Sequence, residues 1–395
     1  MNDTKPPEKR RIPEPIARNA RVLIVDDSAI VRQVLQAQLS RQAGIEVVGT
    51  AADPLAAREK ILALKPDCII LDIEMPHMNG LTFLRKLMKF HPVPTIICSS
   101  VTPKGCALAL ECLEAGALEV VSKPGGSFSV GDVALRLAEL VRVAMHAPPR
   151  VSTISRMPSA ADFVDCAPEK SSSAAPVRSV PKPTINLNPT FRPGLSDRLI
   201  AIGTSTGGTE ALRTVLTALP IETPPILIVQ HMPEGFTKAF ADRLNSMCKI
   251  TVKEAEDGDA VIAGRALLAP GSFHMRLVRE RVGVGSKWIV RVADGPRVLR
   301  HKPSVEVLFE SCAQYAAARA MGIIMTGMGG DGATGLLSMR KAGAVTVAQD
   351  EQSCVVYGMP REAVLCGAVQ TVAPLDRIAG LMMEFTTGAL TAQAA

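Results

Sequence analysis

The fold is decided by one stretch in the second half of the chain, LIAIGTSTGGTEALRTVLTALP, which runs from Leu199 to Pro220. A short apolar run leads into a loop of glycine and hydroxyl residues, and apolar side chains then recur at helical spacing. Strand, tight glycine turn and helix in this order predict one unit of a parallel α/β sheet. Such a turn can cradle a dinucleotide pyrophosphate or hold a serine nucleophile.

The sequence differs from the dinucleotide-binding fingerprint at two points. The fingerprint G-x-G-x-x-G needs a middle glycine so that the backbone can approach the pyrophosphate, but Ser205 stands there when Gly203 and Gly208 are aligned to the outer glycines. The acidic residue expected about 20 residues further on, which would hold a ribose hydroxyl, is also missing. The next apolar run, PILIVQ, leads into His231 instead.

A serine nucleophile fits the same turn. Gly203, Ser205 and Gly207 match the pattern G-x-S-x-G, and the helix that follows points its positive end at the serine. Neighbouring strands lie about 4.8 Å apart, so His231 at the end of the next strand can reach the hydroxyl. A third buried run, MGIIMTGMGGDG, leads into a glycine turn that contains Asp331. The order serine, histidine, aspartate differs from that of the α/β-hydrolases, so the triad chemistry is expected on another α/β fold.

Other residues compete for each of these roles. Ser205 could simply cap the helix, because serine is favoured at helix starts. Two further histidines compete with His231 as the base, and two further aspartates also end apolar runs. These competitors are His274, His301, Asp294 and Asp350. We prefer Asp331 because its glycine-rich setting lets backbone N–H groups approach the same oxyanion, and we expect His301 to have a structural or substrate-facing role.

In the first half, polar side chains follow four apolar runs. The carboxyl ends of parallel strands form one ligand crevice, so carboxylates, a hydroxyl and an amine are expected to meet there. The residues are Asp26 and Asp27, Asp72, Ser99 and Ser100, and Lys123. Clustered carboxylates need a cation, and Mg²⁺ prefers such oxygen ligands. With the metal bound, one aspartate can accept a phosphoryl group whose oxygens Lys123 stabilises.

Length and composition limit the number of domains and the class of protein that the chain can form. A chain of 395 residues predicts two or three domains. Nine scattered cysteines without a C-x-x-C pair favour reduced thiols in the cytoplasm, and the absence of a long apolar run argues against membrane insertion. With one Trp and two Tyr, a dispersed net charge of +6 and no basic recognition helix, we expect no nucleic-acid partner.

A composition shift divides the chain. Between residues 146 and 197 the sequence is rich in Pro, Ser and Ala and lacks sustained hydrophobic periodicity, which predicts a linker. The predicted organisation is therefore a disordered tail at 1–20, one α/β domain at 21–145, the linker at 146–197 and a second α/β domain at 198–390.

The first domain resembles the receiver domain of two-component response regulators in its stretches VLIVDDS, LDIEMPHMNGL, ICSS and SKPGG. The resemblance implies a flavodoxin-like parallel sheet in which Asp72 is phosphorylated and Lys123 contacts the phosphoryl group. It implies Ser99 as the switch hydroxyl, with Ser100 as the competing choice. It also implies a Mg²⁺ site formed by Asp26, Asp27, Asp72 and the backbone carbonyl of Glu74.

The second domain resembles the catalytic domain of the chemotaxis protein-glutamate methylesterases, the CheB family. The stretches GTSTGGTEAL, QHMPEGFTKAFADRLN, RHKPSVEVLFESC and TGMGGDGATGL carry the resemblance. It implies a Rossmann-like parallel sheet with Ser205 as nucleophile, His231 as base and Asp331 as the orienting acid, and with Thr206 and the Met328 backbone near the oxyanion. No cofactor is expected for the esterase reaction.

The joint resemblance implies a phosphorylation-activated serine esterase that releases methanol from γ-glutamyl methyl esters on the cytoplasmic helices of chemoreceptors. Deamidation of receptor glutamines is implied as a second activity, and a histidine kinase of the CheA type as the phosphodonor. We expect a cytoplasmic protein that is recruited to membrane receptor arrays. The alternative is a catalytically silent module that binds a receptor when phosphorylated.

Overall fold

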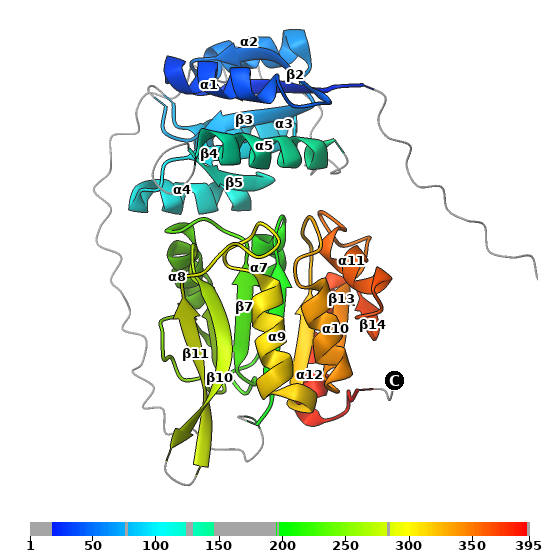
Figure 1. Ribbon diagram of the computed structural model, residues 1–395. Helices are drawn as coiled ribbons and strands as arrows, with labels where there is room; N and C mark the ends of the chain where they lie inside the picture. Colours follow the sequence, from blue (N-terminus) through cyan, green and yellow to red (C-terminus); the bar gives the residue numbers. More distant parts are fainter. Residues whose placement is uncertain are drawn as a thin grey trace, which may run out of the picture.

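We describe the fold from a computed structural model of the chain, which describes residues 18–75, 78–123, 129–145, 195, 197–282 and 285–392 (Figure 1). Most of the predicted tail and linker lie outside the described residues. Within the described ranges, no helix combines the length and the apolar character needed to cross a bilayer.

The N-terminal half is a five-stranded parallel sheet in the order β2-β1-β3-β4-β5. This order is the flavodoxin-like one, which the sequence predicts. The strands are β1 (Ala20–Val25), β2 (Ile45–Ala51), β3 (Cys68–Asp72), β4 (Thr95–Ser99) and β5 (Glu119–Ser122). The helices are α1 (Ala29–Leu39), α2 (Pro54–Leu64), α3 (Gly80–Phe90), α4 (Pro103–Glu114) and α5 (Val130–Ala144). Both central strands β3 and β4 are buried along their whole length, as expected for a sheet covered on both faces.

The C-terminal half is a seven-stranded sheet in the order β14-β13-β12-β6-β7-β9-β8, and all its strand pairs are parallel. Its strands are β6 (Leu199–Thr204), β7 (Ile226–Gln230), β8 (Thr251–Glu254), β9 (Arg265–Leu268), β12 (Ala320–Ile324), β13 (Val345–Gln349) and β14 (Thr371–Ala373). An antiparallel hairpin, β10 (His274–Val282) with β11 (Gly285–Ala293), extends beside it (Figure 1). The sequence predicts parallel sheets alone, so the hairpin is an addition to the predicted architecture.

Helices cover the second sheet and complete the α/β fold. They are α7 (Gly208–Thr217), α8 (Phe236–Met247), α9 (Val305–Tyr315), α10 (Ala333–Lys341), α11 (Met359–Leu365) and α12 (Leu375–Thr387), with a short 3₁₀ turn at Ala317–Arg319. The predicted fold class, two parallel-sheet α/β halves, is confirmed.

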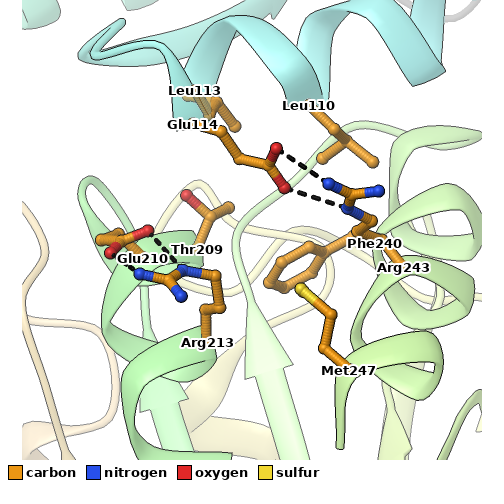
Figure 2. Close-up of a pocket in the computed structure, with 9 residues that line it drawn as sticks. All are labelled: Leu110, Leu113, Glu114, Thr209, Glu210, Arg213, Phe240, Arg243 and Met247. Carbon is orange, nitrogen blue, oxygen red and sulfur yellow. Dashed lines mark hydrogen bonds and ion pairs between the residues drawn. The ribbon is translucent and has the colours of Figure 1, made fainter. Parts of the chain in front are cut away.

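The two halves pack against each other through α4, which lies on α7 and α8 (Figure 1). Apolar side chains of α4 and α8, among them Leu110 and Phe240, line this contact, and one buried apolar cluster continues from the first half into the second. Figure 2 shows the ion pair that crosses the contact: the Arg243 guanidinium donates twice to the Glu114 carboxylate, at 3.0 Å each. The receiver-like half is therefore fixed on the carboxyl-end side of the second sheet.

Candidate active site and phosphorylation site

Ser205 follows β6 directly and is held by its backbone. Its N–H donates to the Thr326 carbonyl at 3.0 Å, and its carbonyl accepts from Gln230 Nε2 at 2.9 Å. The side chain is fully buried, and its Oγ has no hydrogen-bond partner among the described residues. The N-cap of α7 is Gly207, so Ser205 does not cap this helix. An unpaired buried hydroxyl is costly, which points to a chemical use.

Two glycines leave the space that this turn needs. Gly207 has a φ of 78°, and a Cβ there would lie 2.6 Å from the Cβ of Val355. A Cβ on Gly327, which lies in the turn after β12, would lie 2.8 Å from the Cβ of Ser205. Only glycine fits both positions, because L side chains rarely adopt the first backbone conformation and both sites are crowded.

His231 stands beside Ser205 at the end of the neighbouring strand. Thr204 of β6 pairs with Gln230 of β7, and the His231 N–H donates to the Thr204 carbonyl at 3.1 Å. The ring Nε2 donates to Asp331 Oδ2 at 2.8 Å. The buried Nδ1 has no partner in the part of the chain that the structure describes. With Nε2 carrying the proton, Nδ1 is the nitrogen able to accept one.

Asp331 is anchored at the start of helix α9. Besides His231, it accepts hydrogen bonds from the Ser304 hydroxyl at 2.7 Å and from two backbone N–H groups at 2.8 and 3.1 Å. These N–H groups belong to the first turn of α9, where the helix dipole favours a negative charge. Burial acts to raise the pKa of Asp331, but these hydrogen bonds and the nearby His231 hold the pKa below its usual range. The carboxylate therefore stays ionised and orients the imidazole.

His301 lies directly on the candidate base. Its ring stacks on that of His231 with centroids 3.8 Å apart and planes 4° from parallel. Burial, followed by the neighbouring His231, lowers the pKa of His301 to about 3. His301 is therefore a neutral ring that fixes the plane of His231, which is compatible with the first of the two roles expected from the sequence, structural or substrate-facing.

The other competing residues lie in separate interactions. His274 contacts the Pro296 carbonyl through Nε2 at 2.9 Å, and exposed Asp294 pairs with Lys302 at 2.6 Å. Asp350 accepts from the N–H of Ser353 at 3.0 Å and thereby closes the turn after β13. None of these three groups shares a hydrogen bond with Ser205 or His231 in the described ranges.

The expected oxyanion neighbours lie in the same pair of turns. Thr206 is fully buried, and its carbonyl accepts from the Thr326 hydroxyl at 2.9 Å. Met328 follows Gly327 in the turn that holds Ser205 from the other side. Gln230 and Thr326, which link β6 to its two neighbours, are not among the residues predicted from the sequence. Their signal was the polar end of a buried strand, the rule that found His231.

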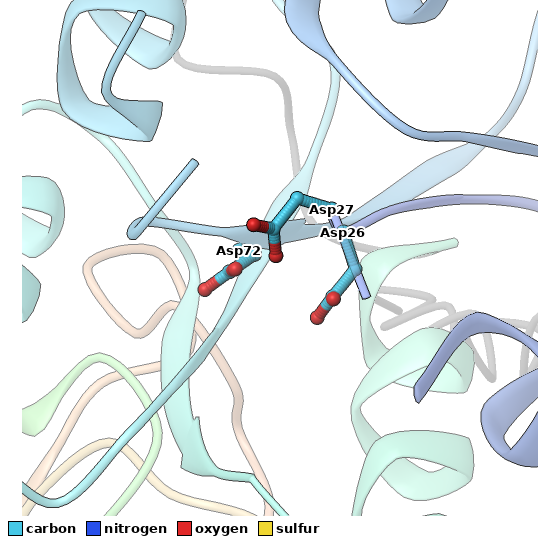
Figure 3. A group of neighbouring side chains, drawn as sticks. All are labelled: Asp26, Asp27 and Asp72. Atoms are coloured by element: carbon cyan, nitrogen blue, oxygen red, sulfur yellow. The ribbon is translucent and has the colours of Figure 1, made fainter. Parts of the chain in front are cut away.

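The first half holds the expected cluster of carboxylates (Figure 3). Asp26, Asp27 and Asp72 each offer an oxygen within 4.8 Å of the others. Lys123 Nζ lies 2.9 Å from Asp26 and 2.8 Å from Asp72. Burial, reinforced by Asp26 and opposed by Lys123, raises the pKa of Asp72 to about 6. Three oxygen donors with one lysine leave negative charge uncompensated, so the donor set fits a hard divalent cation.

The remaining receiver residues lie at the same edge of the first sheet. Ser99 ends β4 and is buried, and its carbonyl accepts from the Lys123 N–H at 2.8 Å. Ser100 instead donates its hydroxyl to the Glu74 carboxylate at 2.6 Å. The Glu74 N–H donates to Asp72 Oδ1 at 3.2 Å. The Ser99 hydroxyl itself lies 3.4 Å from the Ser100 carbonyl, so only the backbone of Ser99 is bound to Lys123.

Comparison with known proteins agrees with both halves. A family model for the response regulator receiver domain matches residues 22–129, and one for the CheB methylesterase matches residues 200–382. A protein-glutamate methylesterase/protein-glutamine glutaminase of Syntrophus aciditrophicus is 50% identical over 359 residues, which cover 91% of this chain and 97% of the relative. A relative of the same description from Rhodopseudomonas palustris is 51% identical over 91% of this chain and 94% of its own. This chain belongs to the CheB methylesterase family.

Proposed function

We propose that the protein is a phosphorylation-activated serine hydrolase that removes methyl groups from γ-glutamyl methyl esters on the cytoplasmic helices of chemoreceptors. Deamidation of receptor glutamines, with ammonia as the leaving group, is the same chemistry on an amide. One observation carries the proposal: the Ser205 hydroxyl and the His231 Nδ1, both without a partner among the described residues, follow adjacent strands, and Asp331 holds the opposite side of the imidazole.

The reaction runs in two steps. Ser205 Oγ attacks the ester carbonyl carbon while His231 Nδ1 takes the hydroxyl proton. The tetrahedral intermediate collapses, the proton passes to the leaving oxygen, and methanol departs from the acyl-serine. Water then attacks the acyl carbon, His231 again takes a proton and returns it to Ser205, and the glutamate carboxylate is released. Asp331 stabilises the imidazolium in both steps.

Backbone donors near Thr206 and Met328 are proposed to hold the oxyanion. Both residues lie in the glycine turns around Ser205, and α7 begins three residues after the serine. The positive end of a helix and fixed N–H groups favour developing negative charge. Removing one such donor typically raises the barrier by about 3 kcal/mol. The family resemblance, not a contact to substrate, selects these two residues.

The first half supplies the switch. We assign phosphoryl transfer from a CheA-type histidine kinase to Asp72, with Asp26, Asp27 and the Glu74 carbonyl as the residues that would hold Mg²⁺. The metal, when bound, neutralises the phosphoryl oxygens. Lys123 contacts the same oxygens from the other side, and Ser99 moves toward them as the switch hydroxyl. Phosphorylation then shifts the population of closed and open arrangements.

The closed arrangement is supported by contacts between the halves. Arg136 of α5 donates to the Thr206 hydroxyl at 3.4 Å, next to the candidate nucleophile. Ser205 and Thr206 are both fully buried in this arrangement. A substrate helix cannot reach Ser205 until α5 withdraws. The unphosphorylated chain is therefore expected to have low activity, and recruitment to receptor arrays would place the activated form beside its substrate.

Methanol release from methylated receptors tests the proposal, with and without a small-molecule phosphodonor. Ser205→Ala should reduce release by about 10³-fold or more, because the hydroxyl forms the covalent intermediate. Ser246→Ala, on the exposed face of α8, is the matched control and should keep full activity. Asp72→Asn should abolish the response to phosphodonor only. Undiminished turnover by Ser205→Ala refutes the nucleophile, and a wild-type chain that binds receptor without releasing methanol would instead be the silent module.

A further inference from the structure

Two hydrogen-bond donors fix the peptide that joins Ser205 to Thr206. The Ser205 carbonyl accepts from the Gly208 N–H at 2.8 Å and from Gln230 Nε2 at 2.9 Å. Donors prefer to lie near the plane of a carbonyl group, so two donors on one oxygen define the orientation of that plane. The first donor belongs to the start of α7, but the second comes from the end of β7. This peptide is therefore held from the neighbouring strand.

The next peptide, between Thr206 and Gly207, is held from the other side. The buried Thr326 hydroxyl donates to the Thr206 carbonyl at 2.9 Å and accepts from the Val356 N–H at 3.0 Å. The Thr326 carbonyl in turn accepts from the Ser205 N–H at 3.0 Å. One threonine therefore binds the backbone of the nucleophile turn both before and after the serine side chain.

These contacts set the direction of two backbone N–H groups. In a planar trans peptide the N–H points away from the carbonyl. The Thr206 N–H is therefore directed away from Gln230, and the Gly207 N–H is directed away from Thr326. Neither N–H donates to an acceptor within the described ranges. In the G-x-S-x-G turn of hydrolases, the N–H of the residue after the serine binds the oxyanion.

The Gln230 amide makes its contacts at a cost to the fold. The side chain is fully buried, and Nε2 also donates to the His231 carbonyl at 3.3 Å, so one amide binds the backbones of the candidate nucleophile and base. Its Oε1 has no hydrogen-bond partner among the described residues, and a buried acceptor without a partner is unfavourable. The Ser205 carbonyl would keep its bond from Gly208 without Gln230. Stability alone therefore does not explain a glutamine at this strand end.

We infer that Gln230 and Thr326 are positioning residues for the oxyanion. They hold two peptide planes so that the Thr206 and Gly207 N–H groups bind the oxygen that becomes negative when Ser205 attacks the ester. The inference deepens the proposed function and rests on it. Donors fixed in advance lower the barrier because they need no rearrangement as the charge develops. Loss of either side chain should therefore lower kcat more than it changes KM.

The experiment uses the full chain, phosphorylated by a small phosphodonor, with methylated receptor as the substrate. Gln230→Met keeps the length of the side chain and removes its N–H donors, and Thr326→Val replaces the hydroxyl with a methyl group of similar size. Each variant should lower kcat for methanol release about 10²-fold and leave KM within about twofold of wild type. Urea denaturation verifies that each variant folds, and either variant alone is sufficient for the test.

A second substrate separates the oxyanion from the other parts of the site. A helical peptide carries one glutamyl methyl ester or the corresponding thionoester, in which sulfur replaces the carbonyl oxygen. Sulfur is a weak hydrogen-bond acceptor, so N–H donors accelerate the reaction of the ester more than that of the thionoester. The ratio of kcat/KM for the ester to kcat/KM for the thionoester should fall about tenfold in both variants.

Two matched control variants lie on β13. Gln349 is also a fully buried glutamine at a strand end, but its amide binds the Thr326 N–H at 2.9 Å and the Ser353 carbonyl at 2.8 Å, outside the nucleophile turn. Thr346 is a fully buried threonine near the start of the strand, and its hydroxyl accepts from the Gln370 N–H at 3.2 Å. Gln349→Met and Thr346→Val should keep nearly the wild-type kcat and the wild-type ratio of ester to thionoester hydrolysis.

Two results would overturn the inference while leaving the esterase in place. The first is an equal loss of kcat in the test and control variants, which would assign the effect to a general loosening of the sheet. The second is a wild-type ratio of ester to thionoester hydrolysis in folded Gln230→Met and Thr326→Val. If the wild-type chain releases no methanol from methylated receptor, the proposed function fails and the inference fails with it.

Discussion

Asp331 has two tasks at once, because it both orients His231 and binds the first turn of α9. A buried carboxylate with this many donors is pre-organised for a charged imidazole. An asparagine at this position would keep the size of the side chain but lose the charge that stabilises the imidazolium.

The first prediction is that Asp331→Asn lowers kcat by about 10⁴-fold. The matched control is Asp294→Asn, because Asp294 also follows an apolar run but is exposed and paired with Lys302. Its kcat should stay within about twofold of wild type. Methanol release from methylated receptor measures both variants. Equal losses in the two variants would mean that the wrong aspartate has been assigned.

His301 makes folding pH-dependent. In the unfolded chain a histidine binds a proton near pH 6.5. In the fold, burial lowers the pKa of His301 to about 3, so the folded ring stays neutral. Because the folded pKa is the lower one, this contribution to stability is intact above pH 6.5 and is lost as the pH falls from 6.5 toward 3.

The second prediction compares His301→Phe with wild type. Phenylalanine keeps a ring to stack on His231 but cannot titrate. Between pH 7 and 5 the free energy of unfolding of the wild type should fall by about 2 kcal/mol more than that of the variant. Urea denaturation at the two pH values measures the difference. Parallel pH dependences would show that His301 takes up a proton in the fold.

Sequence reasoning at the residue scale succeeds where strand ends decide the position. Ser205 and His231 meet because β6 and β7 are adjacent and in register. The stacking of His301 on His231 could not be predicted from the sequence. The turn before His301 has Leu299 and Arg300 at positive φ, and neither residue type is typical of such a turn.

At the scale of elements, the β6–α7 turn fixes the position of the candidate nucleophile Ser205 through its backbone. The turn is tight because Gly207 takes a positive φ and approaches Val355. A displacement of about 1 Å in such a site can cost a factor of about 10² in rate.

The third prediction is that Gly207→Ala destabilises the fold by about 1 kcal/mol or more and lowers kcat about tenfold or more, because the new Cβ meets Val355. Gly258→Ala separates backbone strain from crowding. Gly258 has nearly the same φ, 84° against 78°, but no atom of the described part of the chain lies within 4 Å of its added Cβ. In this control variant the free energy of unfolding should fall by about 1 kcal/mol, and kcat should stay at the wild-type value. Equal kcat values for the two variants would contradict a strict geometric demand at Gly207.

Alternating runs of apolar residues and helical periods predict both parallel sheets, because buried parallel strands read as continuous apolar segments. The β10–β11 hairpin cannot be predicted from this apolar pattern. Charged side chains interrupt its strands, and Arg276 stands directly opposite Arg291 in the register. One Arg291 nitrogen lies 3.1 Å from Asp257, which compensates part of this like-charge pair.

At the scale of the whole molecule, two of the contacts within the described chain join the receiver-like half to the half with the candidate active site. One is the α5 contact at Thr206 and Arg300, and the other is the α4 contact at α7 and α8 (Figure 2). Sequence alone cannot place these contacts, since they depend on how two folded surfaces meet. Within the described residues, the Glu114–Arg243 pair of the α4 contact shares no hydrogen bond with Ser205, His231 or Asp331, so we expect changes to this pair to affect the switch and not the chemistry.

The last prediction concerns the Glu114–Arg243 pair, which crosses the α4 contact. Arg243→Glu should raise the activity of the unphosphorylated chain about fivefold, since losing the pair and adding repulsion shifts the closed state by about 1 kcal/mol. Activity with phosphodonor should stay at the wild-type level, because the open form does not use the pair. Lys238→Glu, which breaks an ion pair within α8 alone, should change neither activity.

The charge swap completes this test. Glu114→Arg combined with Arg243→Glu rebuilds the pair in reverse and should restore the low basal activity. Restoration would assign the effect to the pair itself, not to a general loosening of α8. A swapped chain as active without phosphodonor as Arg243→Glu would show that the α4 contact does not hold the closed state. In that case the α5 contact, through Arg136 and Arg300, is the next one to test.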